Sequence, residues 1–262
     1  MRLLLATVCN DNYILGMLVF LYSLIKHNNL EYDFKIYYKD NLSLENQKKI
    51  KNLYKNVIFE NVDDPDIKTM YPAFLSLLCF KEIKYDRVVF LDCDMLCIGN
   101  IEKLLNFKNN FCICLDHNSL FPTKKKFNIF FGGFKPFTEI NTGVFVVNKH
   151  YLNLETFEKL KAIAKKNIRL KREKLWDQTV LNKFFRFKNV TIIPTIYNCR
   201  KQMLKKKNPN DYNIKIIHYC GTYKPFLFNA SGYGNSPIEY KKTYNLIYKL
   251  WNQYYGEYQS LV

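Results

Sequence analysis

Two aspartates one residue apart, Asp92 and Asp94, directly follow the apolar run Arg-Val-Val-Phe-Leu at 87–91. The β-branched and aromatic residues of this run predict a buried strand, which places both carboxylates at its end. Carboxylates with this spacing can face one divalent cation, and Mg²⁺ or Mn²⁺ bound by few carboxylates completes its shell with substrate phosphates. An Asp-x-Asp in a lysine-rich chain is more often a solvated turn, so the metal-site interpretation depends on the strand before the pair and on the motifs after it.

The segments around this pair alternate between strand and helix patterns, which predicts an α/β fold with a parallel sheet and helices on its faces. In open sheets of this kind, ligands bind beside the carboxyl ends of the strands, where Asp92 and Asp94 are expected. The expected strands are 3–8, 34–38, 57–59, 87–91, 111–115, 143–147, 190–193 and 214–218; helices are expected to start near Ile14, Ser43 and Pro72 and to span 154–164 and 176–185.

Length and composition predict one domain with elaborations, because 262 residues that are 48% hydrophobic can bury a sizeable core. The 40 basic and 23 acidic residues give a formal charge of +17. This charge suits a polyanionic partner or an acidic membrane surface, but the composition bias of an AT-rich genome also produces it. The lysines are not interleaved with aromatic residues in a known nucleic-acid module, so no nucleic-acid partner is expected.

The eight cysteines form no metal-ligand quartet, and their positions predict buried thiols in a reducing compartment. The N-terminal segment becomes polar too soon for a signal sequence, and no apolar window is long enough for a membrane span. We therefore expect a cytoplasmic location.

Two further segments are expected to contact other elements or partners. The loop 121–137 is rich in Lys, Phe and Gly, and loops of this length are usually lids or binding loops. The tail 236–258 carries an apolar stripe that predicts a helix packed on the domain or on a partner. A homodimer and peripheral contact with a membrane surface both remain open for this tail.

Five polar motifs, placed in order along the chain, carry a family resemblance. They are Thr7-Val8-Cys9-Asn10 with Tyr13, Asp92-Cys93-Asp94, Asn141-Thr142-Gly143, Asp177-Gln178, and His218 with Gly221 and Lys224. This series resembles the glycogenin-like retaining glycosyltransferases of family 8. The resemblance implies a Rossmann-like GT-A fold over residues 1–228, with a mostly parallel central sheet that binds a nucleotide-sugar, and a C-terminal helical extension over 229–262. It also implies Mn²⁺-dependent transfer from a UDP-sugar with retention of the anomeric configuration.

At the diphosphate, the resemblance implies that His218 joins Asp92 and Asp94 as a third metal ligand. A neutral imidazole suits Mn²⁺ better than Mg²⁺, which remains the alternative cation. Gly221 would let the backbone approach a phosphate, and Lys224 would neutralise its charge. The metal and Lys224 together would then stabilise the leaving UDP.

At the nucleoside, the resemblance implies a clamp made by the loop after the first strand. Tyr13 would stack on the pyrimidine, while Thr7 and Asn10, with Val8 between them, would read its edge. The alternative is a loop whose Asn10 caps the following helix. Cys93 would touch the nucleotide mainly through its backbone.

At the sugar, Asn141, Thr142 and Gly143 predict a close approach of the backbone just before a buried strand, although a plain β-turn explains them equally well. The resemblance implies that Asp177 accepts hydrogen bonds from donor hydroxyls and that Gln178 lies near the anomeric face. A helix cap is the alternative role of this pair. Since no carboxylate clearly acts as a nucleophile, a front-face mechanism is expected.

Three departures qualify the resemblance. Ser76 stands where a basic donor contact is expected, and Lys174 replaces an aspartate that often precedes the Asp-Gln pair. The self-glucosylated tyrosine of glycogenin has no counterpart near Lys205. We expect a hexosyltransferase that uses UDP-glucose first, with UDP-galactose and UDP-N-acetylglucosamine behind it, and a glycan or protein acceptor. The alternatives are a catalytically silent module that binds an anionic polymer or membrane and, more weakly, a phosphohydrolase.

Overall fold

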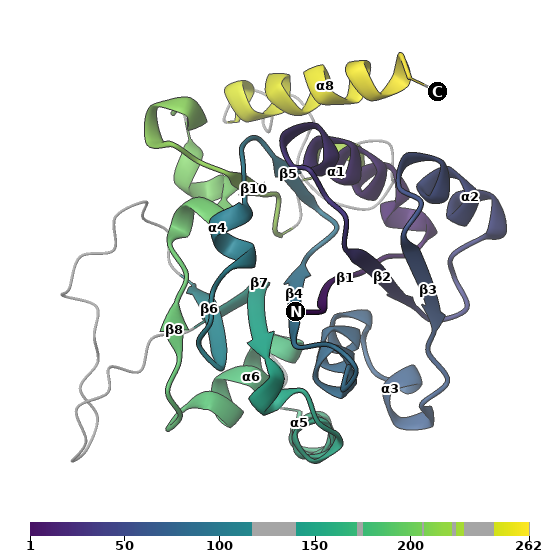
Figure 1. Ribbon diagram of the computed structural model, residues 1–262, viewed down its shortest axis with the longest axis vertical. Coiled ribbons are helices and arrows are strands. Elements are labelled where there is room, and N and C mark those ends of the chain that lie inside the picture. Colours follow the sequence, from purple (N-terminus) through teal and green to yellow (C-terminus); the bar gives the residue numbers. More distant parts are fainter. Residues whose placement is uncertain (117–139, 172–174, 206, 222–223, 228–243, 262) are drawn as a thin grey trace.

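A seven-stranded sheet in the order β3-β2-β1-β4-β7-β6-β8 forms the centre of the molecule (Figure 1). The computed structural model describes residues 1–116, 140–171, 175–205, 207–221, 224–227 and 244–261. The strands are β1 (Leu3–Val8), β2 (Asp33–Tyr38), β3 (Val57–Asn61), β4 (Arg87–Leu91), β6 (Phe111–Leu115), β7 (Ile140–Asn148) and β8 (Thr191–Ile192). Only β7 runs antiparallel to its neighbours, so the expected mostly parallel α/β sheet is confirmed.

Helices cover both faces of this sheet (Figure 1). One layer contains α1 (Ile14–His27), α2 (Leu44–Leu53) and α8 (Asn245–Gln259), and the other contains the 3₁₀ helix η2 (Pro72–Lys81), α5 (Leu154–Arg169) and α6 (Trp176–Phe185). Alternate residues of β1 explain this arrangement, because Leu3 and Leu5 pack into the first layer while Leu4 and Ala6 pack into the second. A strand buried on both faces needs such a continuous apolar run.

The remaining elements are short. Helices α3 (Pro65–Thr69) and α4 (Glu102–Leu105) connect strands of the sheet. The shorter 3₁₀ turns are η1 (Asp11–Tyr13), η4 (Lys149–Tyr151), η5 (Thr195–Tyr197), η6 (Lys201–Leu204), η7 (Pro209–Tyr212) and η8 (Pro225–Leu227). Polar caps start several helices: the Ser43 hydroxyl accepts a hydrogen bond from the Asn46 amide at the start of α2, as expected.

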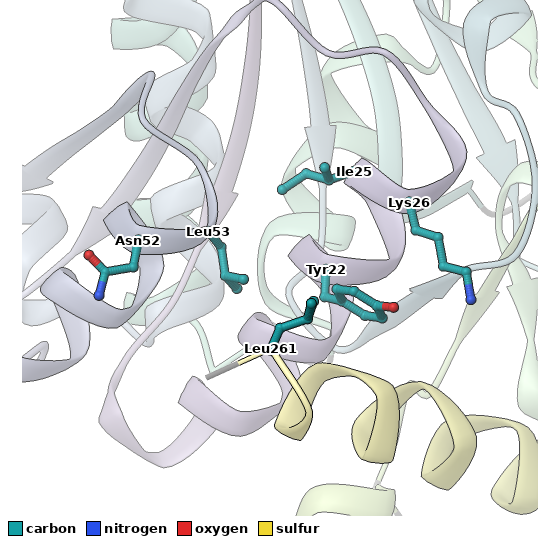
Figure 2. Close-up of a pocket in the computed structure, with 6 residues that line it drawn as sticks. All are labelled: Tyr22, Ile25, Lys26, Asn52, Leu53 and Leu261. Atoms are coloured by element: carbon teal, nitrogen blue, oxygen red, sulfur yellow. The ribbon is translucent and has the colours of Figure 1, made fainter.

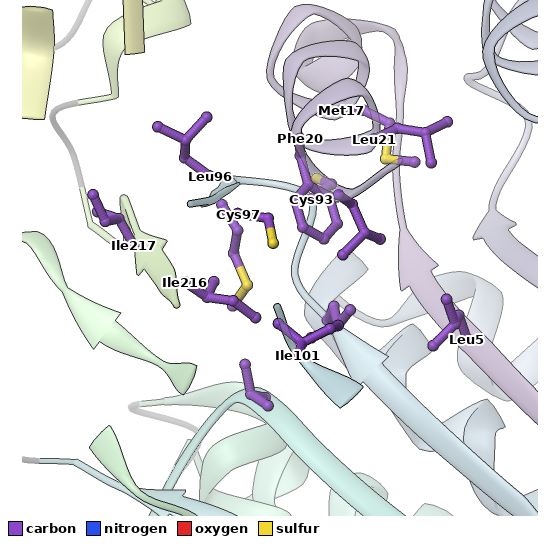
Figure 3. Close-up of a cluster of buried hydrophobic side chains, with 14 of the residues drawn as sticks. Leu5, Met17, Phe20, Leu21, Cys93, Leu96, Cys97, Ile101, Ile216 and Ile217 are labelled. Atoms are coloured by element: carbon purple, nitrogen blue, oxygen red, sulfur yellow. The ribbon is translucent and has the colours of Figure 1, made fainter. Parts of the chain in front are cut away.

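A second sheet brings distant segments together. It contains β5 (Met95–Cys97), β10 (Ile216–His218) and β9 (Cys199–Arg200) in the order β5-β10-β9. β10 pairs antiparallel with β5 and places His218 opposite Met95, next to Asp94. Apolar side chains of β5 and β10 pack with those of α1 beneath this sheet (Figure 3). The two strands therefore bring the late histidine to the early aspartate pair.

The boundaries of one element differ from the expectation. β7 begins at Ile140, so Asn141, Thr142 and Gly143 lie inside a strand and not in a turn before it. Asn and Gly are depleted in strands, but pairing of Ile140 and Asn141 with β6 overrides this preference. The helix expected to start near Pro72 is present as the 3₁₀ helix η2.

The expected tail helix is present as α8, which packs against α1 with Ile247, Trp251, Tyr254 and Tyr258 buried. The division into residues 1–228 and 229–262 stays a prediction, and the loop 121–137 lies outside the described residues, as does the first part of the tail. All eight cysteines are free thiols, seven of them buried. In the part of the chain that the structure describes, no helix is both long and apolar enough to span a membrane.

Candidate active site

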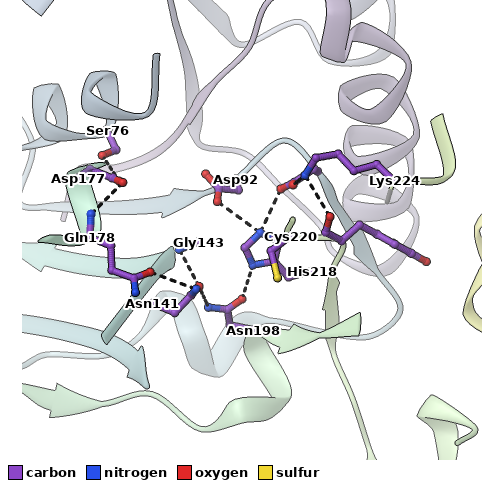
Figure 4. Close-up of polar contacts among 12 residues, drawn as sticks. Ser76, Asp92, Asn141, Gly143, Asp177, Gln178, Asn198, His218, Cys220 and Lys224 are labelled. Atoms are coloured by element: carbon purple, nitrogen blue, oxygen red, sulfur yellow. Dashed lines mark hydrogen bonds and ion pairs between the residues drawn. The ribbon is translucent and has the colours of Figure 1, made fainter. Parts of the chain in front are cut away.

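Asp92 and Asp94, which follow β4, meet His218 at the end of β10 (Figure 4). The Nε2 atom of His218 lies 3.2 Å from Oδ1 of Asp94 and 3.5 Å from Oδ2 of Asp92, and one ligand atom from each residue lies within 4.8 Å of the others. Adjacent ligands of an octahedral cation with bonds of about 2.1 Å are about 3 Å apart. Two carboxylate oxygens and one imidazole nitrogen therefore fit a divalent cation, and this ligand set suits Mn²⁺.

Asp94 is shared between the histidine and a lysine. Its Oδ2 forms an ion pair with Nζ of Lys224, which also donates to the carbonyl of Tyr219 at 3.1 Å. Burial alone would raise the pKa of Asp94, but Lys224 and His218 outweigh burial and hold this pKa below its ordinary value. Burial opposes the charged form of Lys224 as well, and Asp94 in return raises the pKa of the ammonium. Both groups of the pair therefore remain charged at neutral pH.

A cavity of about 430 Å³ opens beside these residues. Its lining includes most of the predicted site residues, from five separate segments of the chain: Val8, Asn10, Tyr13, Asp92, Cys93, Asp94, Asn141, Thr142, Gly143, Asp177, Gln178, His218 and Gly221. Thr7 and Lys224 are buried and are not among the lining residues. Contact of either residue with a donor stays a prediction.

At the end of the cavity near β1, the loop residues have structural roles of their own. The side chain of Asn10 accepts a hydrogen bond from the amide of Tyr13 and caps η1, so the capping alternative applies to this asparagine. The Tyr13 ring packs edge-on against Phe226 at 5.6 Å and lies 5.5 Å from Nζ of Lys224. Burial raises the pKa of Tyr13 to about 12. Gly221 has a φ of +83°, a left-handed conformation that favours glycine.

At the opposite end, Asp177 is buried in the first turn of α6. Its Oδ2 accepts a hydrogen bond from the Ser76 hydroxyl at 2.7 Å, and its Oδ1 accepts from the amide of Gln178 at 2.9 Å. Burial raises the pKa of Asp177 to about 6, although hydrogen bonds from Ser76 and Thr142 oppose this shift. The N-cap of α6 is Leu175, so Asp177 is not the helix cap that the alternative interpretation expected. The serine at the departure position thus orients the buried carboxylate.

Several lining residues had not been predicted. Asp116 follows β6, accepts a hydrogen bond from Nε2 of Gln178 at 2.8 Å, and forms an ion pair with Arg200. A carboxylate just after a buried strand is the signal that identified Asp92, so the same reasoning applied to β6 would have found Asp116. Tyr71 and Trp176, on the rim, had no such signal, because their rings meet only when η2 and α6 pack together.

Two other places bear on the site. Lys174, the second departure from the family pattern, lies outside the described residues. A second cavity of about 600 Å³ lies between α1, α2 and the end of α8 (Figure 2). None of the described residues that line it carries a carboxylate, thiol or imidazole: they are Tyr22, Ile25, Lys26, Asn52, Leu53 and Leu261. Chemistry of the kind expected from the motifs therefore belongs to the first cavity.

Comparison with known proteins identifies the family of the chain. The sequence model of glycosyl transferase family 8 matches residues 4–230, which is most of the chain. The chain belongs to glycosyl transferase family 8. The family match covers all five motifs, so the resemblance to family 8 is confirmed.

A curated relative and two solved structures extend the comparison. An uncharacterized protein of Acanthamoeba polyphaga mimivirus is 25% identical over 271 residues, which cover 95% of this chain and 91% of the relative. The galactosyltransferase LgtC in complex with donor and acceptor sugar analogues superposes with a TM-score of 0.66 and 18% identity. An active-site mutant of LgtC superposes with a TM-score of 0.68 and 17% identity. Both matches cover 97% of this chain and 95% of LgtC. At these identities the likeness to LgtC shows the fold, and it confirms the expected GT-A architecture.

Proposed function

We propose that this family 8 protein is a metal-dependent retaining hexosyltransferase that uses a UDP-sugar. The observation that carries the proposal is the meeting of Asp92, Asp94 and His218 within 4.8 Å at one side of a cavity that has Asp177 and Gln178 at the other. This arrangement would provide a cation site and a sugar site at the two ends of one space of about 430 Å³. Glucose is the first candidate for the sugar, and galactose is the next because LgtC is a galactosyltransferase.

The residues at the metal end would hold the diphosphate of the donor. Asp92, Asp94 and His218 would bind Mn²⁺, with Mg²⁺ as the alternative, and the bound cation would supply positive charge to the phosphate oxygens. The charged Lys224 side chain lies against Asp94 and would add a second positive charge beside the leaving UDP. Gly221 would let the backbone approach the phosphates because it carries no side chain, and its left-handed φ favours glycine at this position.

The residues at the sugar end would hold the hexose for attack. Asp177 would accept hydrogen bonds from sugar hydroxyls, because Ser76 and the Gln178 amide already fix the orientation of its carboxylate. Gln178 would lie near the anomeric carbon, from its position beside Asn141 on β7. Its amide is a poor nucleophile, which supports attack by the acceptor on the face that the UDP leaves.

A stacked aromatic pair marks where the acceptor would bind. The rings of Tyr71 and Trp176 are stacked with centroids 4.3 Å apart, and both residues remain exposed on the rim of the cavity. Trp176 has a φ of +42°, a left-handed conformation that costs of the order of 1–3 kcal/mol in a non-glycine residue and is typical of functional sites. An exposed aromatic face next to Asp177 suits the apolar face of a pyranose ring, so we place the acceptor glycan there.

Replacement of the acidic pair tests the proposed function. We expect the purified protein with Mn²⁺ to release UDP from at least one UDP-sugar, and we expect Asp92→Asn with Asp94→Asn to abolish this release because the cation loses both carboxylates. Mass spectrometry of a UDP-sugar panel measures free UDP and any mass added to acceptor or protein. Asp63→Asn, at an exposed carboxylate after β3, is the matched control. Turnover that survives the double substitution would rule out the mechanism.

The alternative function, a catalytically silent module, predicts a different result. Ser76, which replaces an expected basic donor contact, and the charge of +17 favour this alternative. A ligand that binds only the native state raises the melting temperature, so a shift with UDP that requires Mn²⁺ supports the enzyme. If UDP gives no shift and anionic vesicles or polyanions do, the module is the better description.

A further inference from the structure

A chain of side-chain hydrogen bonds links the metal end of the cavity to the sugar end (Figure 4). Nδ1 of His218 lies 2.8 Å from Oδ1 of Asn198, and Nδ2 of Asn198 donates to Oδ1 of Asn141 at 2.8 Å. Nδ2 of Asn141 donates to Oε1 of Gln178 at 3.4 Å, and Nε2 of Gln178 donates to Oδ2 of Asp116 at 2.8 Å. Three amides thus connect an imidazole to a carboxylate.

Two groups determine the direction of these hydrogen bonds, because one of them can only donate and the other can only accept. The backbone N–H of Gly143 donates to Oδ1 of Asn141 at 3.1 Å, so this atom must be the amide oxygen and not the nitrogen. At the other end, the Asp116 carboxylate accepts hydrogen bonds only, and its ion pair with Arg200 keeps it charged. Gln178 must therefore point its nitrogen at Asp116 and its oxygen at Asn141. Both ends require the same orientation of Asn141.

This orientation requires a proton on Nδ1 of His218. Because the Asn141 oxygen accepts from Asn198, the nitrogen of Asn198 must face Asn141 and its oxygen must face His218. An amide oxygen can only accept, so Nδ1 of His218 must donate. Nδ1 therefore carries a proton, and Nε2 is the ring nitrogen that faces Asp92 and Asp94. When Nε2 gives its lone pair to a cation, the proton that Nδ1 donates to Asn198 is the one that the ring keeps.

We propose that Asn198 is a positioning residue that holds His218 in the Nδ1–H tautomer and so prepares Nε2 to bind a divalent cation before the cation arrives. Asn198 is 2% exposed, lines no part of the cavity and does not touch the expected metal position itself. Groups that fix the tautomer of a metal-binding histidine typically change metal affinity by 10- to 100-fold when they are replaced. The proposal rests on the metal site of the proposed function but not on transfer of any sugar.

Two measurements without turnover test this proposal. Long-range ¹H–¹⁵N NMR of the metal-free protein at about pH 8 should show the proton of His218 on Nδ1. Titration with Mn²⁺, followed by EPR of the free ion, should show that Asn198→Leu weakens binding by about 10- to 100-fold. Asn167→Leu is the matched control, because Asn167 is an equally buried asparagine on α5.

Two further variants keep the result interpretable if Asn198→Leu does not fold. Asn198→Asp retains an oxygen that accepts from Nδ1, so His218 should keep its Nδ1–H tautomer. Asp116→Asn removes the carboxylate at one end of the hydrogen-bond chain, but the Gly143 amide still fixes the orientation of Asn141. The Mn²⁺ affinity of this variant should therefore stay within about threefold of the native value. Absence of a proton from Nδ1 in the native protein, or equal Mn²⁺ affinities for Asn198→Leu and Asn167→Leu, would overturn the proposal. If no UDP-sugar is turned over, both measurements still stand, so the two proposals fail separately.

Discussion

Gly143 is the residue on which the position of the His218 ring depends most directly. A Cβ atom at this position would lie 2.4 Å from Cε1 and 2.6 Å from Nδ1 of His218, closer than real Cβ contacts. The imidazole ring can therefore occupy its place only because position 143 carries no side chain. The strand β7 thus accepts a residue that weakens strands so that a ring from β10 can lie against its backbone.

We expect Gly143→Ala to displace His218 and to weaken Mn²⁺ binding by about tenfold or more, since a misplaced ligand loses most of its bond to the cation. EPR of free Mn²⁺ measures the affinity, and thermal unfolding shows whether the fold survives. Gly256→Ala in α8 is the control, because a Cβ there meets no atom within 4 Å. This control should be neutral or slightly stabilising, by about 0.5–1 kcal/mol. Equal Mn²⁺ affinities of the two variants would contradict the expectation.

The pKa of Asp177 predicts the pH below which kcat/KM should fall. Burial raises its pKa to about 6, so the carboxylate that would accept sugar hydroxyls is lost as the pH falls through about 6. Ser76→Ala removes a hydrogen bond that favours the carboxylate, which should raise the pKa of Asp177 and move this fall in kcat/KM to higher pH. The measurement is kcat/KM against pH for UDP release. Ser23→Ala, at another buried serine, should leave the fall at the same pH; a fall unmoved by Ser76→Ala would exclude Asp177 as its origin.

At the scale of elements, the packing of η2 against α6 determines the rim of the cavity. Tyr71 stands at the start of η2 and Trp176 at the start of α6, and their rings stack on each other. The stacked pair therefore forms only when the two helices pack together. We expect Trp176→Ala to raise the KM for a glycan acceptor by about tenfold, or ~1.4 kcal/mol, with little change in KM for the donor. Phe187→Ala is the control, because Phe187 is 83% exposed and does not line the cavity. A rise in the KM for the donor alone would mean that the stacked rings contact the donor and not the acceptor.

Helix α8 is expected to contribute to stability. Trp251 is 2% exposed where α8 packs on α1, so Trp251→Ala should lower the free energy of unfolding by ~3–5 kcal/mol through the cavity that it leaves. Leu246→Ala, on the same helix at a residue that is 43% exposed, should change it by less than about 0.5 kcal/mol. Urea unfolding of both variants gives the comparison. Similar values would mean that α8 is not part of the cooperative core.

The elements of the main sheet were largely predictable from sequence, and the reasons are local. The run of β1 is apolar on both faces, and Ser43 and Pro72 mark helix starts. The strands β5 and β9 were not predicted, because segments of two or three residues carry no period and form strands only by pairing with β10. The first part of β7 was not predicted either, because its pairing with β6, and not its residue types, makes it a strand.

At the scale of the whole molecule, the candidate site depends on contacts between segments far apart in the chain. The aspartate pair was found from its own strand, whereas the position of His218 came from the family resemblance and is explained by the pairing of β10 with β5. The amides of Asn198 and Asn141 could not have been paired from sequence, since Asn141 lies on β7 of the main sheet and Asn198 lies between η5 and β9 of the second sheet. Local pattern thus finds the carboxylates, and tertiary pairing completes the site.

The order of synthesis gives this pairing a consequence. Asp94 and Lys224 are 130 residues apart, and β10 can pair with β5 only after the ribosome has released the chain past His218. Closing so long a loop is slow compared with forming the local contacts of β1 to β4. A nascent chain would therefore offer a cation two carboxylates without an imidazole, and tight Mn²⁺ retention would report that β10 has been synthesised and has paired with β5.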